Sequence, residues 1–425
     1  MFLKTIFDKL APLFNKGGKL EKFEPLFEGT TSFFLTSGEV TNSKVHVRDN
    51  VDLKRLMIIV WLAVIPAALW GMFNLGHNTL AFMDKNHLVT TFALFSDDWR
   101  FAVLQMLGFS LQPDFINELA VGMAYFLPLY AIVFAVGGFW EVLFCIVKGH
   151  PINEGFFVTS ILFALIVPPS IPLWEAALGI SFGVVIGKEI FGGTGMNFMN
   201  PALVGRAFLF FAYPAECSGD KVWIATNAAY DGSTGATPLA QWAAGEIDAT
   251  HFAQNVSNVN IDWLHAFFGF MPGAIGEVST FMILIGLVIL LFTKIASWRI
   301  VFSIFLGMTV VSTLFNMIAT EGSNPMLFMP FYWHFVLGGF AFGMVFMATD
   351  PVTSPYTKKG KYIYGFLIGA MVVLIRVVNP AFPEGMMLAI LFGNMCAPLI
   401  DYMVKSGNIK KLLARAAKVA SVKGE

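Results

Sequence analysis

Charged residues are scarce in this chain of 425 residues: 27 Lys or Arg and 28 Asp or Glu make up only 13% of the sequence. Soluble globular proteins carry about a quarter charged residues. The deficit excludes an ordinary water-soluble domain and a highly charged disordered chain. The net charge of −1 also excludes a nucleic-acid binder, because no excess of positive charge attracts phosphate backbones.

Cysteine and histidine are scarce as well. Cys145, Cys217 and Cys396 are too few for a four-thiolate iron–sulfur cluster. The seven His residues form no His-x-x-x-His pair, so we expect neither a haem nor a protein-held metal ion. No Gly-x-Gly-x-x-Gly fingerprint follows a strand pattern, so a nicotinamide dinucleotide is not expected to bind to this chain itself.

Apolar side chains, in contrast, make up 56% of the residues. A membrane-spanning helix needs about 20 consecutive, mainly apolar residues. Ten runs approach that length, some of them interrupted by Gly or Pro: 55–75, 119–147, 155–171, 173–191, 196–213, 275–291, 300–319, 326–349, 363–378 and 385–404. The sequence therefore predicts an all-α polytopic membrane protein with about ten transmembrane helices.

The few basic residues predict the orientation, because Lys and Arg concentrate on the cytoplasmic side of a membrane. Nine of them lie at or before residue 55, and six lie in the tail after residue 404. Segment 214–274 contains one basic residue, Lys221, against six acidic residues. Ten spans thus place both termini in the cytoplasm and segment 214–274 on the opposite side.

A weak internal symmetry divides the spans into two groups of five. Glu154-Gly155 matches Glu384-Gly385, and Asn200-Pro201 matches Asp350-Pro351. Five spans per half invert the second half relative to the first, and such repeats are common in transporters, often with broken helices. The predicted regions are a cytoplasmic arm (1–54), a first repeat (55–213), an outer loop (214–274), a second repeat (275–404) and a basic tail (405–425). The tail suits an anionic membrane lipid surface, or serves only to fix the topology.

The outer loop contains the sequence Asp-Gly-Ser-Thr-Gly-Ala-Thr-Pro over residues 231–238. Such a composition is common in turns, and that is the simpler interpretation. The chemical interpretation is that small neighbours leave the Thr237 hydroxyl sterically open, while Pro238 stiffens the chain beyond it. An exposed hydroxyl near an acidic group suits modification by an external enzyme.

The sequence of 231–237 resembles the motif in which the last Thr carries FMN through a phosphoester bond. The chain from about residue 40 onward is similar to the B subunits of the bacterial sodium-translocating NADH:quinone oxidoreductases. The similarity rests on His-Val-Arg-Asp (46–49), Gly-Gly-Phe-Trp-Glu (137–141), Asn-Glu-Gly-Phe-Phe (153–157), Gly-Gly-Thr-Gly-Met-Asn (192–197) and Ala-Thr-Asp-Pro-Val-Thr-Ser-Pro (348–355). The flavin motif is shared with a subunit of RNF-type ferredoxin:NAD oxidoreductases, whereas the first-half motifs and the long arm favour the quinone-reducing complex.

The resemblance implies a redox subunit in a bacterial inner membrane, with covalent FMN on Thr237, noncovalent riboflavin between helices and ubiquinone as substrate. Its partners would be an NADH-binding subunit with FAD and an iron–sulfur cluster, a second subunit with covalent FMN, small membrane subunits and a flavin transferase. Electron transfer would drive Na⁺ export. A channel or small-solute transporter, a different class of protein, also fits ten spans in an inverted repeat.

Candidate site residues fall into three groups. Around the attachment threonine we expect Asp231, Thr234 and Gly235, with Arg206 and Arg376 as competing partners for the flavin phosphate. For riboflavin or quinone the resemblance indicates Gly137, Gly138, Glu141, Phe156, Phe157, Asn197 and Asn200. Asp350 and Asp401 are candidates for the sodium path, because Na⁺ prefers hard oxygen ligands and carboxylates inside a membrane are costly without a role.

Structural roles remain as alternatives for several of these residues. The Gly137–Gly138 pair suits close helix packing. Asp350 suits a helix cap beside Pro351, and Asp401 suits a boundary position that reaches the cytoplasm.

Overall fold

The computed structural model describes residues 2–14, 18, 20–24, 27, 31, 53–85, 98–148, 155–217, 219, 236–245, 262–320, 322–379 and 384–422. Within these ranges every regular element is helical. The prediction of an all-α polytopic membrane protein is therefore confirmed. The candidates Asp231, Thr234 and Gly235 lie outside the described residues.

Five helices among the described residues are long and apolar enough to cross a membrane. They are α3 (Leu53–Lys85), α5 (Phe115–Lys148), α13 (Trp298–Ile318), α16 (Lys358–Val378) and α17 (Met386–Val422). An α-helix rises about 1.5 Å per residue, so about 20 residues cover the hydrocarbon layer of roughly 30 Å. Each of the five reaches that length.

Four further apolar helices are too short to cross alone: α6 (Gly155–Ile166), α7 (Leu173–Val185), α8 (Pro201–Ala212) and α12 (Thr280–Phe292). Proline and capping residues set their ends. Pro168 and Pro169 follow α6, and Pro201 begins α8 directly after Asn200, whose side chain accepts a hydrogen bond from the Ala202 amide at 3.0 Å. The broken helices that the sequence predicts are therefore present.

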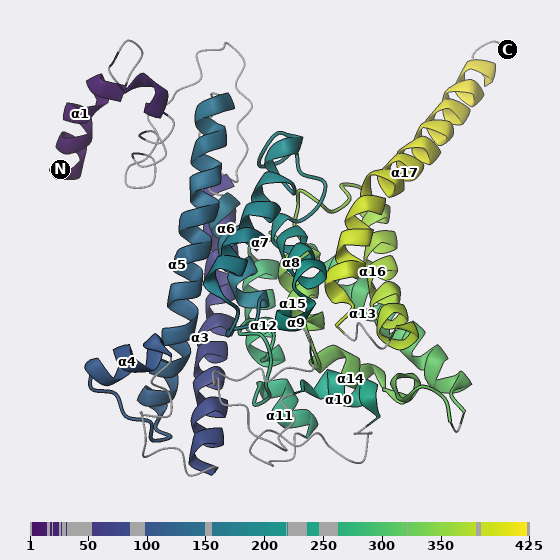
Figure 1. Cartoon of the computed structure of the whole chain (residues 1–425). Coiled ribbons are helices and arrows are strands. Elements are labelled where there is room, and N and C mark those ends of the chain that lie inside the picture. The colour runs from purple at the N-terminus through teal and green to yellow at the C-terminus, as the bar shows by residue number, and fades with distance from the viewer. Residues whose placement is uncertain are drawn as a thin grey trace.

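The remaining elements are short: α1 (Phe2–Phe14), η1 (Glu21–Phe23), α4 (Trp99–Met106), η3 (Glu189–Phe191), α9 (Pro214–Cys217), α10 (Pro238–Ala244), α11 (Trp263–Phe268), η4 (Pro325–Phe328), α14 (Phe331–Val336), α15 (Phe340–Phe342) and the π-helix η5 (Gly343–Met347). All ten predicted apolar runs contain helix. Figure 1 shows α4, α10, α11 and α14 at one end of the bundle, while the last turns of α17 leave the opposite end.

The predicted end of the first apolar run, at residue 75, is wrong, because α3 continues to Lys85. Polar side chains in this extension find partners inside the bundle. His77 Nδ1 lies 2.8 Å from Glu118 Oε1 of α5, and Thr79 Oγ1 donates to the Leu75 carbonyl at 2.7 Å. Helix can therefore continue past the apolar run without leaving buried polar groups unpaired.

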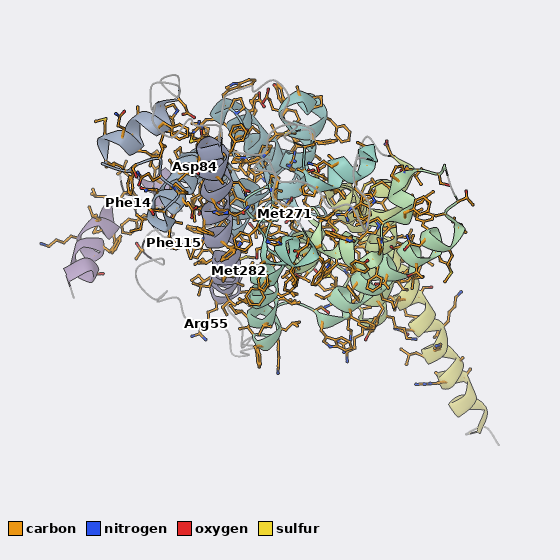
Figure 2. The ribbon with its side chains drawn as sticks, turned by 90° about the horizontal axis from the view of Figure 1, so that it is seen from below. Phe14, Arg55, Asp84, Phe115, Met271 and Met282 are labelled. Atoms are coloured by element: carbon orange, nitrogen blue, oxygen red, sulfur yellow. The ribbon has the colours of Figure 1, made fainter. Side chains whose placement is uncertain are left out.

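The predicted boundary between the last span and the tail, at residue 404, is not a break in the structure. α17 runs without interruption from Met386 to Val422. The tail is rich in Lys, Leu and Ala, which have high helix propensity, so the helix propagates beyond its packed part. Figure 2 shows this part of α17 standing clear of the body of the protein.

The two halves are joined where α6 ends. The Leu165 carbonyl accepts a hydrogen bond from the Gly276 amide at 2.9 Å, and the Ile166 carbonyl accepts one from Arg206 Nε at 3.0 Å. The last carbonyls of a helix lack partners within the helix, and inside a membrane no water replaces them. The break in α6 is thus stabilised by residues that come later in the chain.

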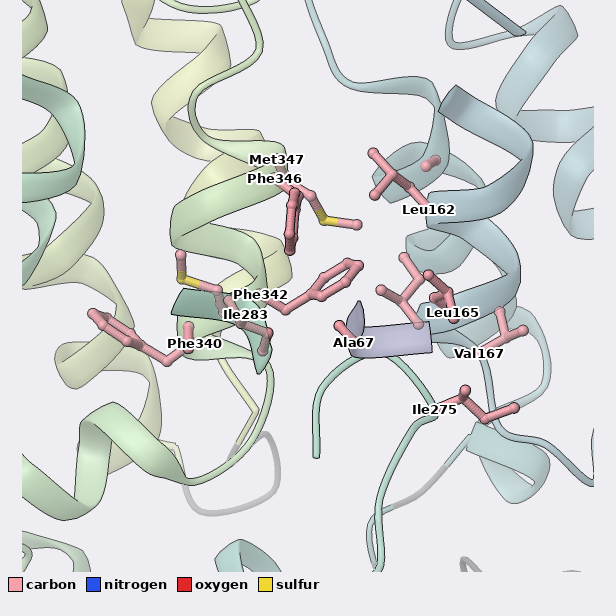
Figure 3. Packing of buried hydrophobic residues seen from close by; sticks show 14 of the residues in the cluster. Ala67, Leu162, Leu165, Val167, Ile275, Ile283, Phe340, Phe342, Phe346 and Met347 are labelled. Carbon is pink, nitrogen blue, oxygen red and sulfur yellow. The ribbon is translucent and has the colours of Figure 1, made fainter. Parts of the chain in front are cut away.

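Beside this junction the halves share an apolar core. Figure 3 shows Phe342 and Met347 pointing toward Leu162 and Leu165 of α6. The ring centroids of Phe342 and Phe346 lie 5.1 Å apart, and all of these side chains are buried. Leu162 and Phe346 line one cavity, and Phe342 and Met347 line another, so this apolar layer lies between the two cavities.

Candidate functional site

Thr237 is the N-cap residue of α10. Its backbone is extended (φ −64°, ψ 153°), and its Oγ1 accepts a hydrogen bond from the Ala240 amide at 3.3 Å. Pro238 follows as the first helical residue, where its missing N–H costs nothing. The hydroxyl is therefore held in one orientation at the start of a short helix.

Neighbouring contacts fix the position of α10. Trp242 is buried and donates from its indole N–H to the Pro325 carbonyl at 3.2 Å, while the Thr237 amide donates to the Gly219 carbonyl at 2.9 Å. A Cβ at Gly219 would lie 3.4 Å from Thr237 Oγ1. The absence of a side chain at position 219 keeps the approach to the hydroxyl open on that side.

An outer cavity of about 390 Å³ opens beside Thr237. We use this name for the space between Thr237, the segment 271–278, Gly338 and Glu384. Two carboxylates, those of Glu277 and Glu384, face it, and none of its described lining residues is Lys or Arg.

A central cavity of about 400 Å³ shares Glu277 and Glu384 with the outer cavity, and Arg206 lines it as well. Arg206 Nη2 lies 3.5 Å from Glu384 Oε2. The arginine is buried, whereas the side chain of Glu384 is 33% exposed. Arg206 thus pairs with an acid, which was one of its two predicted partners.

Arg376 is fully buried and bonds to main-chain atoms. Its guanidinium donates to the His334 carbonyl and to the Leu337 carbonyl, each at 2.9 Å. Its Nη2 lies behind Gly338, where a Cβ would come within 3.1 Å of it. The structure places neither predicted arginine among the lining residues of the outer cavity, so the competition between them for a phosphate stays open.

An inner cavity of about 710 Å³ lies on the other side of the apolar layer. It is lined by α3, α6, the segment 188–201, α12, η5 and the turn 349–352. The polar side chains among its lining residues are Thr159, Lys188, Thr194, Asn197, Asn200, Thr349 and Asp350. The structure thereby brings Asn197 and Asn200, both predicted for riboflavin or quinone, to one cavity.

Both asparagines also shape the backbone there. Asn197 accepts from the Gly195 amide at 3.3 Å and donates to the Met199 carbonyl at 3.0 Å. Asn200 caps α8 through its Oδ1. The glycines of this loop, including Gly192 and Gly195, have φ values of 122° and 91°, which other residues rarely adopt.

Lys188 lines the inner cavity and pairs with Glu141 of α5. Both side chains are about 98% buried, so each charge depends on the other. A second pair lies next to it: Lys148 Nζ is 3.2 Å from Glu189 Oε2, with Glu189 buried and Lys148 partly exposed. Neither residue of the second pair belongs to the lining of the inner cavity.

Asp350 and Asp401, the predicted sodium-path residues, both accept hydrogen bonds at helix ends. Asp350 accepts from the Val352 amide at 3.0 Å and from the Thr353 hydroxyl at 3.2 Å, and it lines the inner cavity. Asp401 accepts from the Tyr356 amide, the Thr357 amide and the Thr357 hydroxyl at 2.7, 3.1 and 2.6 Å. Asp401 therefore stabilises the start of α16.

The glycine pair lies where α5 meets α6. A Cβ at Gly137 would come within 2.5 Å of the ring of Phe156, whereas a Cβ at Gly138 would be at an ordinary 3.6 Å. Phe134 packs against both Phe156 and Phe157, with ring centroids 5.7 and 5.5 Å away. Close packing thus accounts for Gly137, and this group lies apart from the lining of the inner cavity.

Sequence reasoning missed three charged cavity residues: Lys188, Glu277 and Glu384. A signal was present for two of them, because Lys188 and Glu277 fall inside predicted apolar runs, where an ionisable residue is a functional candidate by default. Glu384 comes directly before the last run and carried no comparable signal.

The fold and the site together define a class: a polytopic helical membrane protein with internal cavities and a half-buried threonine at one of them. The model of the NQR2, RnfD, RnfE family matches residues 40–410. This chain therefore belongs to that family.

Individual relatives match almost the whole chain. The B subunit of the Na(+)-translocating NADH-quinone reductase of Klebsiella pneumoniae (strain 342) is 58% identical over 418 residues, which are 98% of this chain and 100% of the relative. The protein of the same description from Yersinia pestis is 58% identical over 419 residues, with the same coverage. That of Neisseria meningitidis serogroup A / serotype 4A is 55% identical over 418 residues, again with 98% and 100% covered.

Proposed function

We propose that this chain is the membrane redox subunit of a sodium-pumping NADH:ubiquinone oxidoreductase. In this proposal it carries electrons from FMN, bound through a phosphoester to Thr237, to noncovalent riboflavin and then to ubiquinone, and the transfer is coupled to Na⁺ export. The observation that carries the proposal is a threonine hydroxyl held beside a cavity, in a chain 58% identical to a sodium-translocating reductase subunit over 98% of its length.

The residues around Thr237 fit a tethered flavin. The hydroxyl is half buried, Gly219 leaves its approach free, and a cavity of about 390 Å³ adjoins it. A bound flavin would supply the electron acceptance and release, and the tether would keep it at high effective concentration beside the helices.

The inner cavity fits a second, noncovalent ring. Its lining combines apolar side chains with a few polar ones, as ligand sites usually do. Asn197, Asn200 and Lys188 are the residues that would hold the ring there. Gly137, Gly138, Glu141, Phe156 and Phe157 remain the proposed neighbours of the quinone.

For sodium, we propose a path that uses the carboxylates of Asp350 and Asp401. Asp350 is supported by its position on the inner cavity. Asp401 is buried close to the start of α16, where backbone amides surround it.

We further propose that the chain lies in a bacterial inner membrane with both termini in the cytoplasm and Thr237 on the periplasmic side. The charge distribution supports this orientation, as does the position of α10 at the end of the bundle opposite the last turns of α17 (Figure 1). The proposed partners are an NADH-binding subunit with FAD and an iron–sulfur cluster, a second covalent-FMN subunit, small membrane subunits and a periplasmic flavin transferase.

Two alternative functions predict different cofactors or activities. A subunit of an RNF-type ferredoxin:NAD oxidoreductase would carry the same covalent flavin but would not support quinone reduction by NADH. The relatives of 55–58% identity, which include the N-terminal arm in their matches, favour the quinone-reducing complex. A channel or small-solute transporter would carry no flavin.

The test uses the complex purified from a host that makes the flavin transferase. Intact mass and in-gel fluorescence of the denatured chain are compared for the wild type, Thr237→Ala and the control Thr226→Ala, which alters another threonine of the same loop. We expect one FMN on the wild type and on the control, and none on Thr237→Ala, together with loss of NADH:quinone activity.

Covalent flavin on Thr237→Ala would contradict the attachment site. A wild-type chain without any flavin would contradict the redox proposal and favour the channel or transporter. Ferredoxin:NAD activity without quinone reduction in the wild-type complex would favour the RNF-type subunit.

A further inference from the structure

The two neighbouring ion pairs between α5 and the segment 188–189 differ in one respect. The pair of Lys188 and Glu141 has its lysine on the wall of the inner cavity and its glutamate outside the lining. The pair of Lys148 and Glu189 has neither partner on the wall. Of these two pairs, the first therefore has its basic residue on the wall of the cavity and the second has neither residue there.

The main chain holds Lys188 in this position. Its carbonyl accepts hydrogen bonds from the Phe191 amide and the Gly193 amide, each at 3.2 Å. Its side chain is about 98% buried, and Glu141 compensates its charge. Two buried charges of opposite sign depend on each other, so removal of Glu141 would leave the charge of Lys188 uncompensated.

The remaining charge on the lining comes from the second half of the chain. Asp350 lines the same cavity, and its two carboxylate oxygens accept hydrogen bonds from the Val352 amide and the Thr353 hydroxyl. The charged residues on the described lining are thus Lys188 from the first half and Asp350 from the second half.

We propose that Lys188 binds the noncovalent flavin of the inner cavity and stabilises its reduced form, with Glu141 as the residue that positions it. This inference rests on the proposed function. Reduction of a flavin adds electron density to its pyrimidine edge, at N1 and the C2 carbonyl, and charges near that edge tune its potential. A cation in a low-dielectric site acts strongly on that added charge.

The outer cavity differs from the inner one in the charges of its lining residues. Glu277 and Glu384 face the outer cavity, whereas Arg206, which is paired with Glu384, lies on the central cavity. With a flavin at each cavity, the charge of Lys188 would make the inner ring the better electron acceptor, and no bond to Lys188 would form or break.

The experiment measures the midpoint potential and the content of the noncovalent flavin in the purified complex. The main variant is Lys188→Met combined with Glu141→Gln, which removes both charges and so leaves no buried charge without its counter-charge. The matched control is Lys148→Met combined with Glu189→Gln, which removes the adjacent pair that does not face the cavity. Lys188→Arg tests whether a positive charge at this position suffices to keep the flavin bound and its midpoint potential unchanged.

We expect the main variant to shift the one-electron equilibrium at least tenfold toward the oxidised flavin, which corresponds to about 59 mV in midpoint potential. Loss of riboflavin from this variant, with riboflavin retained in Lys188→Arg, also supports the assignment. The control pair and Lys188→Arg should keep the wild-type content and most of the wild-type potential.

An unchanged potential in the main variant with riboflavin retained would overturn the inference. Loss of riboflavin from both the main variant and Lys188→Arg would also overturn it, because a packing role predicts that result. A wild-type complex without noncovalent flavin would contradict the proposed function instead. Covalent flavin at Thr237 in each variant shows that the chain has folded and matured.

Discussion

The outer and inner cavities differ in the charges of their lining residues. Glu277 and Glu384 line the outer cavity, whereas Lys188 lines the inner one together with Asp350. In both places a buried basic residue pairs with an acid, Arg206 with Glu384 and Lys188 with Glu141. The acid of the first pair lines the outer cavity and the base of the second pair lines the inner one, so similar ion pairs give the two cavities walls of different charge.

The largest expected effect on stability concerns the ion pair of Arg206 and Glu384. Arg206→Met should lower the free energy of unfolding by about 3 kcal/mol, the lower end for a buried ion pair, because Glu384 is 33% exposed. The substitution also leaves the Ile166 carbonyl without its donor. Thermal denaturation of the purified complex measures the loss. Adding Glu384→Gln should recover part of it, and a double variant no more stable than the single one would speak against the pair.

The next largest expected effect concerns Asp401, which bonds to the start of α16. Asp401→Asn should cost about 2 kcal/mol, because a charged acceptor of three hydrogen bonds is lost from the start of α16. The same variant should weaken the dependence of turnover on sodium. Turnover at a series of sodium concentrations checks this, and an unchanged sodium response in a less stable variant would limit Asp401 to capping α16.

A smaller effect should follow from Gly339→Ala. The added Cβ would lie 2.6 Å from Glu277 Oε1, so this carboxylate has to move within the outer and central cavities. Because the end of a flexible side chain gives way, the cost should be about 1 kcal/mol. The visible spectrum of the covalent flavin should shift with the carboxylate. Gly407→Ala in α17, where a Cβ would meet nothing within 4 Å, is the control and should leave the spectrum unchanged.

The smallest effect concerns Asp262, the exposed N-cap of α11. A hydrogen bond from the His265 amide, followed by interactions with its side chain, holds the pKa of Asp262 below its usual value. Because the folded-state pKa is lowered, the stabilisation is present above the unfolded pKa of about 3.9 and is lost as the pH falls through the folded value. Asp262→Ala should cost about 0.5 kcal/mol at pH 7. Hydrogen exchange of the α11 amides checks this, and a difference that persists below the folded pKa would contradict the assignment.

The helical class, the apolar runs and the breaks at proline could be predicted from the sequence, because hydropathy and proline act locally. The extension of α3 to Lys85 was not predictable in this way, since its polar residue His77 finds a partner in Glu118 of another helix, α5. The same holds for the continuous α17, where the sequence predicted a tail separate from the last span.

The site was predictable only in part. Asn197 and Asn200 were selected by resemblance, and they do line one cavity. The pairing of Lys188 with Glu141 and of Arg206 with Glu384 arises from packing between distant segments, and no spacing in the sequence encodes it. In the sequence Lys188 is one basic residue among others, and only the structure places it on a cavity wall.

The broken end of α6 has a mechanical consequence. Its Leu165 carbonyl is bonded to Gly276, and its Ile166 carbonyl is bonded to Arg206, which in turn pairs with Glu384, so two contacts tie the first half to the second near this point. A transporter that rocks one half against the other would have to break both ties in every cycle. These contacts brace the two halves of this chain against such a motion.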